Sequence, residues 1–252
     1  MTRSAAMTLL ALDTSTRTAG IALYNGVQVL SESIWVSQDH QTVELAPAIE
    51  NLLIKAGTNV SELGALGVAL GPGSFTGLRI GLALAKGLAL AQNIPIVGVP
   101  TLDALAVAQP VQHSQLAAIL QAGRGRLAVN WYQPIDKSWR SIGQLEVLTI
   151  AELSERIQEL TLVCGELTED ERRVLGHNHR FIMLASPALS LRRPSFLAEL
   201  AWQKWQSGKI DSPAILSPIY LHYRQPIPER SGYSWALWPI NYLYFFVFTA
   251  DC

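Results

Sequence analysis

Three apolar runs within the first 36 residues constrain the fold most, because a two-residue turn joins the second run to the third. The runs are Thr8–Asp13, Ala19–Tyr24 and Val27–Trp35, and Asn25-Gly26 stands between the last two. Asn-Gly between alternating apolar segments is the strongest short hairpin signal, since both residues tolerate positive φ. The spacing therefore predicts an antiparallel meander of three strands.

Helix and strand signals alternate after this meander. Apolar residues recur at helical spacing after Gln41, and Gly57 suits the end of that helix. The expected elements are helices at 41–56, at 78–92 and from 101 to 108, with buried strands at 64–70 and 95–99. Three antiparallel strands followed by helix, strand, helix and strand is the order of a ribonuclease-H-like subdomain. We therefore expect an α/β chain with the actin-like ATPase fold.

The second half of the chain repeats a weaker form of the same order. The sequence predicts strands at 116–121, 126–133, 145–148 and 161–164, helices at 150–160 and 195–207, and an extended stretch at 217–224. We expect two similar subdomains, each with a mixed sheet and helices, over residues 1–108 and 109–225. A tail over 226–252 is rich in aromatic side chains and has no assigned role.

Composition limits the classes of function. Hydrophobic residues make up 49% of the chain and charged residues 15%, so much of it should be buried or paired with a partner. A net charge of −1 argues against RNA binding by the chain alone. Cys164 and Cys252 lack C-x-x-C spacing, which indicates reduced thiols in a cytoplasmic protein. No apolar run is long enough to span a bilayer, so we expect no membrane association. A start at Met7, directly before the first strand, is left open.

The glycine-rich segment Leu70–Gly81 (LGPGSFTGLRIG) lies between a predicted strand and a predicted helix. Its backbone N–H groups could bind an anion, and a tight structural turn is the alternative. It lacks the lysine of a P-loop. In actin-like ATPases an acid placed like Asp13 orients metal or phosphate, whereas a turn is the simpler interpretation. The candidate nucleotide or anion residues are Asp13, Thr14, Ser15, Gly71, Gly73, Ser74 and Thr76.

Small residues form two stripes on the helix that follows this loop. Glycine inside a helix costs about 1 kcal/mol relative to alanine, so its presence needs a packing reason. One stripe can pack on the chain's own sheet and the other on a partner's helix. Internal packing of both is the alternative. The stripes are Gly77, Gly81, Ala85 and Ala89, and Ala83, Gly87 and Ala91.

Other charged and metal-ligating residues give weak signals. His177-x-His179 is a close-spaced histidine pair, but no acid or thiol cluster accompanies it, so we expect no metal site. The pairs Arg172-Arg173 and Arg192-Arg193 are expected at the surface, with RNA contact as the alternative.

Three segments together resemble the bacterial TsaB (YeaZ) family. They are LALDTSTRTAGIALYNG at 10–26, DHQTVELAPAIENLL at 39–53 and GPGSFTGLRIGLALAKGLALAQNIPIVGVPTLDALA at 71–106. The likeness is strong over about the first 108 residues and scattered from there to 224. It implies the non-catalytic dimerization subunit of the complex that makes threonylcarbamoyladenosine in tRNA. A stand-alone actin-like ATPase or kinase is the alternative.

The resemblance implies a heterodimer with a catalytic TsaD-type subunit, joined by a TsaE-type ATPase, with tRNA contacted only through the complex. A homodimer of the chain alone is left open. In the family, the first two helices form the interface as a four-helix bundle, so Gly81→Leu or Ala85→Trp should block pairing and leave the fold largely intact. The implied interface residues are Val43, Ala46, Pro47, Glu50, Leu53, Gly77, Gly81, Leu82, Leu84, Ala85, Leu88 and Ala89.

The resemblance also implies that this chain has no catalytic residues. The catalytic paralogue carries a metal-binding His-x-x-x-His after the strand that corresponds to 95–99, whereas this chain has no histidine between Val99 and Leu105. It therefore implies no metal and no intrinsic cofactor. ATP or ADP at the interface of the complex is left open.

Overall fold

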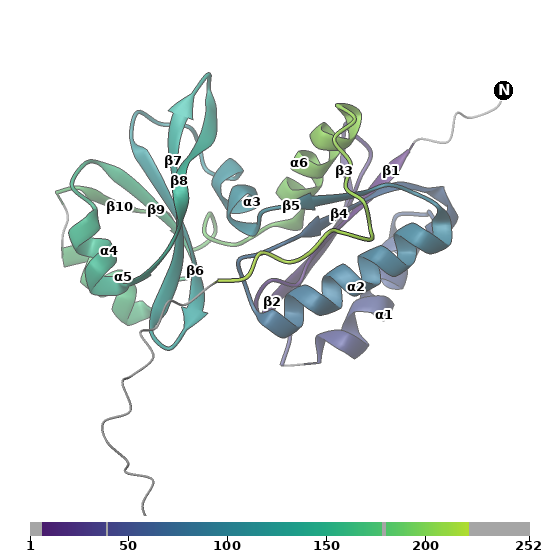
Figure 1. Cartoon of the computed structure of the whole chain (residues 1–252), viewed down its shortest axis with the longest axis horizontal. Coiled ribbons are helices and arrows are strands. Elements are labelled where there is room, and N and C mark those ends of the chain that lie inside the picture. The colour runs from purple at the N-terminus through teal and green to yellow at the C-terminus, as the bar shows by residue number, and fades with distance from the viewer. Residues whose placement is uncertain (1–6, 39, 178–179, 222–252) are drawn as a thin grey trace, which may run out of the picture. The chain divides into compact units, whose positions relative to one another are not determined.

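The computed structural model describes residues 7–38, 40–177 and 180–221, which contain two five-stranded mixed sheets (Figure 1). The first sheet has the order β3-β2-β1-β4-β5 and the second the order β10-β9-β6-β7-β8. The strands of the first sheet are β1 (Thr8–Asp13), β2 (Thr18–Tyr24), β3 (Val29–Val36), β4 (Leu63–Ala69) and β5 (Ile96–Val99). Those of the second are β6 (Gln115–Gly123), β7 (Arg126–Ile135), β8 (Ser138–Thr149), β9 (Thr161–Gly165) and β10 (Ile182–Leu184).

Both sheets have one topology. In each, the first three strands form an antiparallel meander, β1-β2-β3 and β6-β7-β8. The remaining two strands then add in parallel on the other side of the first strand, as β4 and β5 or as β9 and β10. This duplicated arrangement confirms the expected actin-like ATPase fold class.

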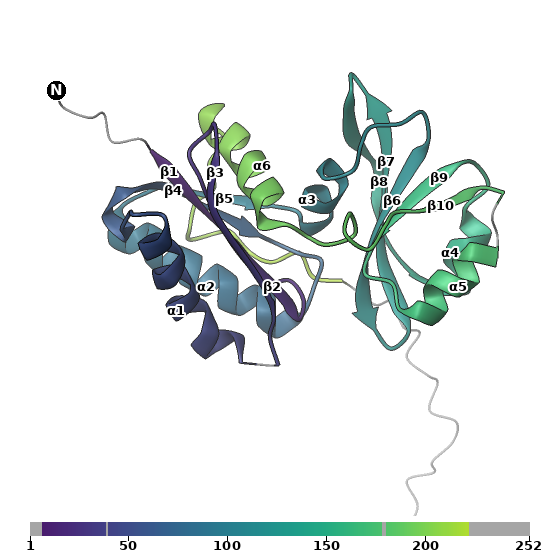
Figure 2. The ribbon, with the colours of Figure 1, turned by 180° about the vertical axis from the view of Figure 1, so that it is seen from behind.

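Helices cover both faces of the first sheet (Figures 1 and 2). On one face lie α1 (Gln41–Lys55) and α2 (Phe75–Gln92), whose apolar sides pack with β1, β2 and β4. On the other lies α6 (Pro194–Gln206), which follows the second sheet in the chain but packs on the first. The first sheet is therefore completed by residues from the far end of the described chain.

The second sheet is covered in the same way. On one face lies α3 (Thr101–Val107), and on the other lie α4 (Ile150–Arg156) and α5 (Glu169–His177). A short 3₁₀ helix, η1 (Val60–Glu62), precedes β4. Among the described residues, no helix is both long and apolar enough to cross a bilayer.

The structure differs from the sequence predictions mainly in the second half. Strand β8 is longer than the predicted 145–148, and α4 ends at Arg156 rather than near 160. Residues 217–221 form no regular element, so the predicted extended stretch is not a strand there. The remainder of that stretch and the tail 226–252 lie outside the described residues.

Helix α5 and strand β10 were not predicted. Helix α5 has a single buried side chain, Leu175, so it lacks the apolar stripe on which helix prediction depends. A usable signal was present, because Thr168 and Glu171 form a capping box. The Glu171 carboxylate accepts from the Thr168 N–H at 2.7 Å, and the Glu171 N–H donates to the Thr168 hydroxyl at 3.3 Å.

Glu32 of β3 fixes the start of α6 on the first sheet. Its carboxylate accepts hydrogen bonds from the Ser195 N–H at 2.9 Å and from Arg193 Nε at 3.0 Å. A carboxylate at a helix N-terminus is favoured, because the first N–H groups and the helix dipole are positive there. Burial alone would raise the pKa of Glu32, but these hydrogen bonds lower it below its usual 4.5.

We expect Glu32→Gln to reduce stability at neutral pH and to flatten the acid dependence of unfolding. The pKa of Glu32 is lower in the folded state than in the unfolded chain, so its ionised carboxylate stabilises the fold at pH values above its unfolded-state pKa. This stabilisation is lost as the pH falls through the folded-state pKa. Urea unfolding at neutral pH and below pH 4.5 measures both effects. Glu155→Gln, at an exposed position, is the control. If the free energy of unfolding changed with pH in the same way for the wild type and for Glu32→Gln, the stabilising role given to the Glu32 carboxylate would be contradicted.

Candidate functional site

The guanidinium of Arg192 is the centre of a buried polar cluster that joins the two sheets. Its Nε donates to Asp13 Oδ2 at 3.0 Å, and its Nη1 donates to Glu166. Its Nη2 donates to Thr16 Oγ1 at 2.8 Å and to the carbonyl of Thr18 at 2.9 Å. Because Asp13 ends β1 and Glu166 follows β9, the cluster lies where a strand of each sheet reaches its carboxyl end.

Arg192 is 4% exposed, so its charge depends on these partners. Burial alone would lower the pKa of Arg192, but the nearby carboxylates of Asp13 and Glu166 raise it. The expectation that Arg192 lies at the surface is therefore wrong. Sequence reasoning missed it because an Arg-Arg pair is typical of exposed chain, and its partner Asp13 lies 179 residues away.

The cluster also changes the interpretation of Asp13. Each of its carboxylate oxygens has a protein donor, since Oδ1 accepts from the Ser15 N–H at 2.8 Å and Oδ2 accepts from Arg192. With the side chain 5% exposed and paired to a cation, Asp13 is not available to orient a metal or a phosphate in this conformation.

The glycine-rich loop is held against the turn after β1. The Gly71 N–H donates to Thr101 Oγ1 at 2.9 Å, and the Ser74 N–H donates to the Ser15 carbonyl at 2.6 Å. A Cβ atom at Gly73 would lie 2.2 Å from that carbonyl, so glycine is required for this close approach. These N–H groups have internal acceptors, and the geometry favours the tight structural turn over an open anion cradle.

Ser74 begins α2 as its N-cap. Its hydroxyl accepts from the Gly77 N–H at 3.3 Å, so α2 starts at Phe75 rather than at the predicted Leu78. Thr76, the last of the predicted anion-loop residues, lies exposed in the first turn. Gly77 faces inward, since a Cβ there would lie 2.2 Å from the Thr14 carbonyl.

An apolar groove of about 430 Å³ runs between α1 and α2. Ala46, Ile49 and Leu53 of α1 line one side, and Leu84 and Leu88 of α2 line the other. Ile54 of α1 also lines the groove and is exposed, and further exposed apolar side chains on the same two helices are Val43 and Leu90. The groove therefore lies on the two helices that the sequence assigned to a partner.

The described residues contain no group of three or more His, Cys, Asp or Glu side chains placed to hold a metal ion. His177 ends α5, and its ring Nδ1 lies 2.6 Å from the Arg173 carbonyl. His179 lies outside the described residues. Cys164 is buried in β9, and burial raises the pKa of its thiol. The absence of a metal therefore stays a prediction for the whole chain.

Comparisons with known proteins place the chain in a family. The family described as TsaD: tRNA N6-adenosine threonylcarbamoyltransferase matches residues 29–179, more than half of the chain. The tRNA threonylcarbamoyladenosine biosynthesis protein TsaB of Escherichia coli K12 is 32% identical over 158 residues, which cover 62% of this chain and 68% of that protein. The chain belongs to the TsaB family. The resemblance inferred from the sequence is thus confirmed.

A second TsaB sequence and the structure of a YeaZ protein support the same family assignment. The TsaB protein of Bacillus subtilis 168 is 39% identical over 127 residues, which cover 50% of this chain and 56% of that protein. The structure of YeaZ from Pseudomonas aeruginosa superposes with a TM-score of 0.69 at 27% identity, and covers 85% of this chain and 100% of that one. The fold of this TsaB-family chain is therefore shared along most of its length.

The structure divides the interface residues that were predicted from the TsaB resemblance. Exposed or half-buried are Val43, Ala46, Pro47, Glu50, Leu84 and Leu88. Buried within the chain are Leu53, Gly77, Gly81, Leu82, Ala85 and Ala89. The stripe containing Gly81 packs on the chain itself, so its assignment to a partner is wrong. The second stripe, Ala83, Gly87 and Ala91, is exposed and can face a partner.

We expect Arg192→Met to destabilise the fold by about 3–5 kcal/mol, because removal of the cation leaves the buried carboxylate of Asp13 and the half-buried carboxylate of Glu166 without their charged partner. Urea unfolding at neutral pH measures the loss. Arg173→Met is the matched control, since Arg173 is exposed and its pairs with Glu169 and Asp170 should contribute at most about 1 kcal/mol. Equal stability of the two variants would contradict the role given to Arg192.

Gly81 and Gly87 of α2 should respond in opposite directions to alanine. A Cβ at Gly81 would lie 2.2 Å from the buried Thr14 hydroxyl, so Gly81→Ala should cost about 1–3 kcal/mol. Gly81→Leu should be worse, which corrects the expectation that it spares the fold. A Cβ at Gly87 meets nothing within 4 Å, so Gly87→Ala should stabilise by about 0.5–1 kcal/mol. Thermal unfolding separates them, and the same sign for both would refute this packing.

Proposed function

We propose that this chain is a non-catalytic scaffold subunit in the synthesis of threonylcarbamoyladenosine in tRNA, and that it pairs with a catalytic TsaD-type subunit. Its relatives in E. coli and B. subtilis are named tRNA threonylcarbamoyladenosine biosynthesis proteins. The matching family is named for the threonylcarbamoyltransferase itself. The observation that carries the pairing is the apolar groove between α1 and α2.

The surface around the groove has the composition of a helix-packing interface. Val43, Ile54 and Leu90 are 68%, 67% and 70% exposed. Exposure to water of several apolar side chains on two neighbouring helices is unfavourable and is typical of an interaction surface. Exposed Ala83 and Gly87 allow another helix to approach α2 closely. Two helices of a TsaD-type subunit would complete a four-helix bundle. A second copy of this chain is the competing occupant.

The non-catalytic part of the proposal is supported by the state of Asp13 and the glycine-rich loop. Arg192 neutralises Asp13, and the N–H groups of Gly71 and Ser74 are used internally. These internal contacts disfavour the stand-alone ATPase or kinase, and we expect no ATP turnover by the chain alone. The proposal gives ATP hydrolysis to a TsaE-type subunit. A nucleotide would lie at the junction of the complex, and tRNA would be held by the assembled cytoplasmic complex.

We expect Ile54→Glu to weaken pairing with the TsaD of the same organism, because a carboxylate in an apolar interface is costly to desolvate. Ile215→Glu is the matched control, since Ile215 is 81% exposed and does not line the groove. Co-expression followed by size-exclusion chromatography with light scattering measures pairing and separates a heterodimer from a homodimer. Threonylcarbamoylation of tRNA with TsaE added measures the consequence.

In this experiment the wild type and Ile215→Glu should form a one-to-one complex and support modification. Ile54→Glu should weaken association at least tenfold, about 1.4 kcal/mol, and lower activity in proportion at limiting concentration. Equal co-purification of both variants would reject the groove as the interface. Modification that proceeds equally well without this chain would reject the scaffold role.

A further inference from the structure

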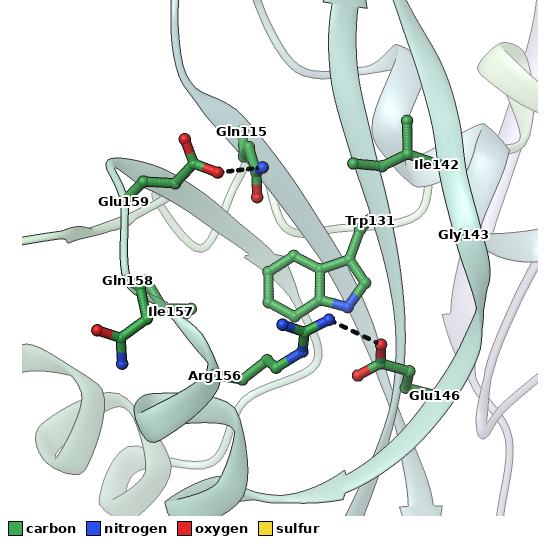
Figure 3. A pocket seen from close by; sticks show the side chains of 9 residues that line it. All are labelled: Gln115, Trp131, Ile142, Gly143, Glu146, Arg156, Ile157, Gln158 and Glu159. Carbon is green, nitrogen blue, oxygen red and sulfur yellow. Dashed lines mark hydrogen bonds and ion pairs between the residues drawn. The ribbon is translucent and has the colours of Figure 1, made fainter.

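A hollow of about 270 Å³ lies over Trp131 on the second sheet (Figure 3). It results from a bulge between β7 and β8. Val129 pairs with Glu146 and Trp131 pairs with Ile142, so residues 143–145 of β8 face the single residue Asn130 of β7. Gly143 adopts a φ of +75°, which permits the bend. Bulges of this kind re-aim side chains and are frequent beside functional sites.

The indole of Trp131 forms the floor of the hollow and carries an unused donor. Trp131 is 7% exposed, and within the described residues its Nε1–H has no hydrogen-bond partner. A buried donor without an acceptor destabilises the fold, because the hydrogen bond to water that it loses on burial is not replaced. Figure 3 shows the nitrogen on the side of the ring that faces Arg156 and Glu146. An acceptor at that place would remove the cost.

Arg156 offers a second under-used donor at the same end. Its guanidinium lies 5.9 Å from the centroid of the Trp131 ring, and Nη2 is 3.5 Å from Glu146 Oε1, beyond a good hydrogen bond. The side chains of Arg156 and Glu146 are 61% and 31% exposed. A pair this open contributes little to stability and can exchange partners.

The other end of the hollow is acidic. Glu159 accepts from the Gln115 amide there, and the Trp131 ring lies between the two ends, with Ile157 near the side of the hollow that carries Glu159 and Gln158 (Figure 3). Among the lining residues one guanidinium stands beside two carboxylates, a formal charge of −1. A simple anion is therefore disfavoured. A ligand that fits the hollow carries an acceptor group for the Trp131 and Arg156 donors, a cation beside that group for Glu146, and a second donor that reaches Glu159 at the other end.

We propose that this hollow binds a free basic α-amino acid such as lysine. The α-carboxylate accepts hydrogen bonds from Trp131 Nε1 and from Arg156, and the α-ammonium pairs with Glu146. The aliphatic part of the side chain lies along Ile157, and its cationic end reaches Glu159. Each charge of the ligand then meets a group of opposite charge, and the buried indole N–H gains its acceptor.

The test follows the indole ¹H–¹⁵N resonances of the full chain, with that of Trp131 assigned by its loss in Trp131→Phe. L-Lysine at up to about 10 mM, enough to detect a Kd near 1 mM, should shift the Trp131 resonance with a saturating dependence. Nα-acetyl-L-lysine lacks the α-cation and L-lysine amide lacks the α-anion. Each should bind at least tenfold more weakly, a difference of about 1.4 kcal/mol.

Variants of the exposed charges locate the site. Glu146→Gln and Arg156→Gln should each weaken lysine binding at least tenfold, about 1.4 kcal/mol. Trp139→Phe is the matched control for the replacement of Trp131, since Trp139 Nε1 already donates to the Gln109 carbonyl at 3.0 Å. The Trp139→Phe variant should bind lysine as the wild type does. An unmoved Trp131 resonance, equal binding of the acetylated analogue, or unchanged binding by both charge variants would overturn the proposal.

Discussion

The buried contact between Arg192 and the turn that follows β1 is the interaction on which the rest of the structure depends. A guanidinium that is 4% exposed must keep its partners, because an unpaired buried charge costs several kcal/mol. Its partners belong to the end of β1 and to Glu166 after β9. Arg192 also lies two residues before the start of α6, which packs on the first sheet. One side chain therefore links the end of β1, the residue after β9 and the segment in which the chain returns from the second sheet to the first.

The same turn organises the helices that carry the proposed interface. The Thr14 hydroxyl donates to the Gly77 carbonyl at 2.7 Å, which holds the first turn of α2. The Thr16 carbonyl accepts from the Gln41 amide at 2.7 Å, which holds the first turn of α1. The Ser15 and Thr101 hydroxyls share a hydrogen bond of 2.8 Å at the start of α3. Polar groups that could have bound a ligand bind the protein's own helices instead, and this fixes the geometry of the groove.

Local patterns predicted the first sheet well, and distant contacts explain what they missed. Strand β1 and helices α1 and α2 were predicted within about three residues of their observed ends, since apolar periodicity and turn residues are local signals. The burial of Arg192 could not be predicted, because its carboxylate partners lie 26 and 179 residues away in the chain. The two small-residue stripes were found, but their spacing alone does not say which one faces the sheet. Contact between Gly81 and Thr14 decides that, and it belongs to the tertiary structure.

Whether polar groups have hydrogen-bond partners inside the protein therefore distinguishes structural sites from binding sites in this chain. Around Asp13 nearly every donor has an internal acceptor, so a ligand would have to break contacts that hold the fold. Between α1 and α2, apolar side chains such as Ile54 remain in water, and the buried indole N–H of Trp131 has no acceptor within the part of the chain that the structure describes. Both are costs of the isolated chain that a bound partner or ligand would remove, and removal of such a cost adds directly to binding free energy. For this reason we place recognition on the groove and the hollow rather than on the glycine-rich loop.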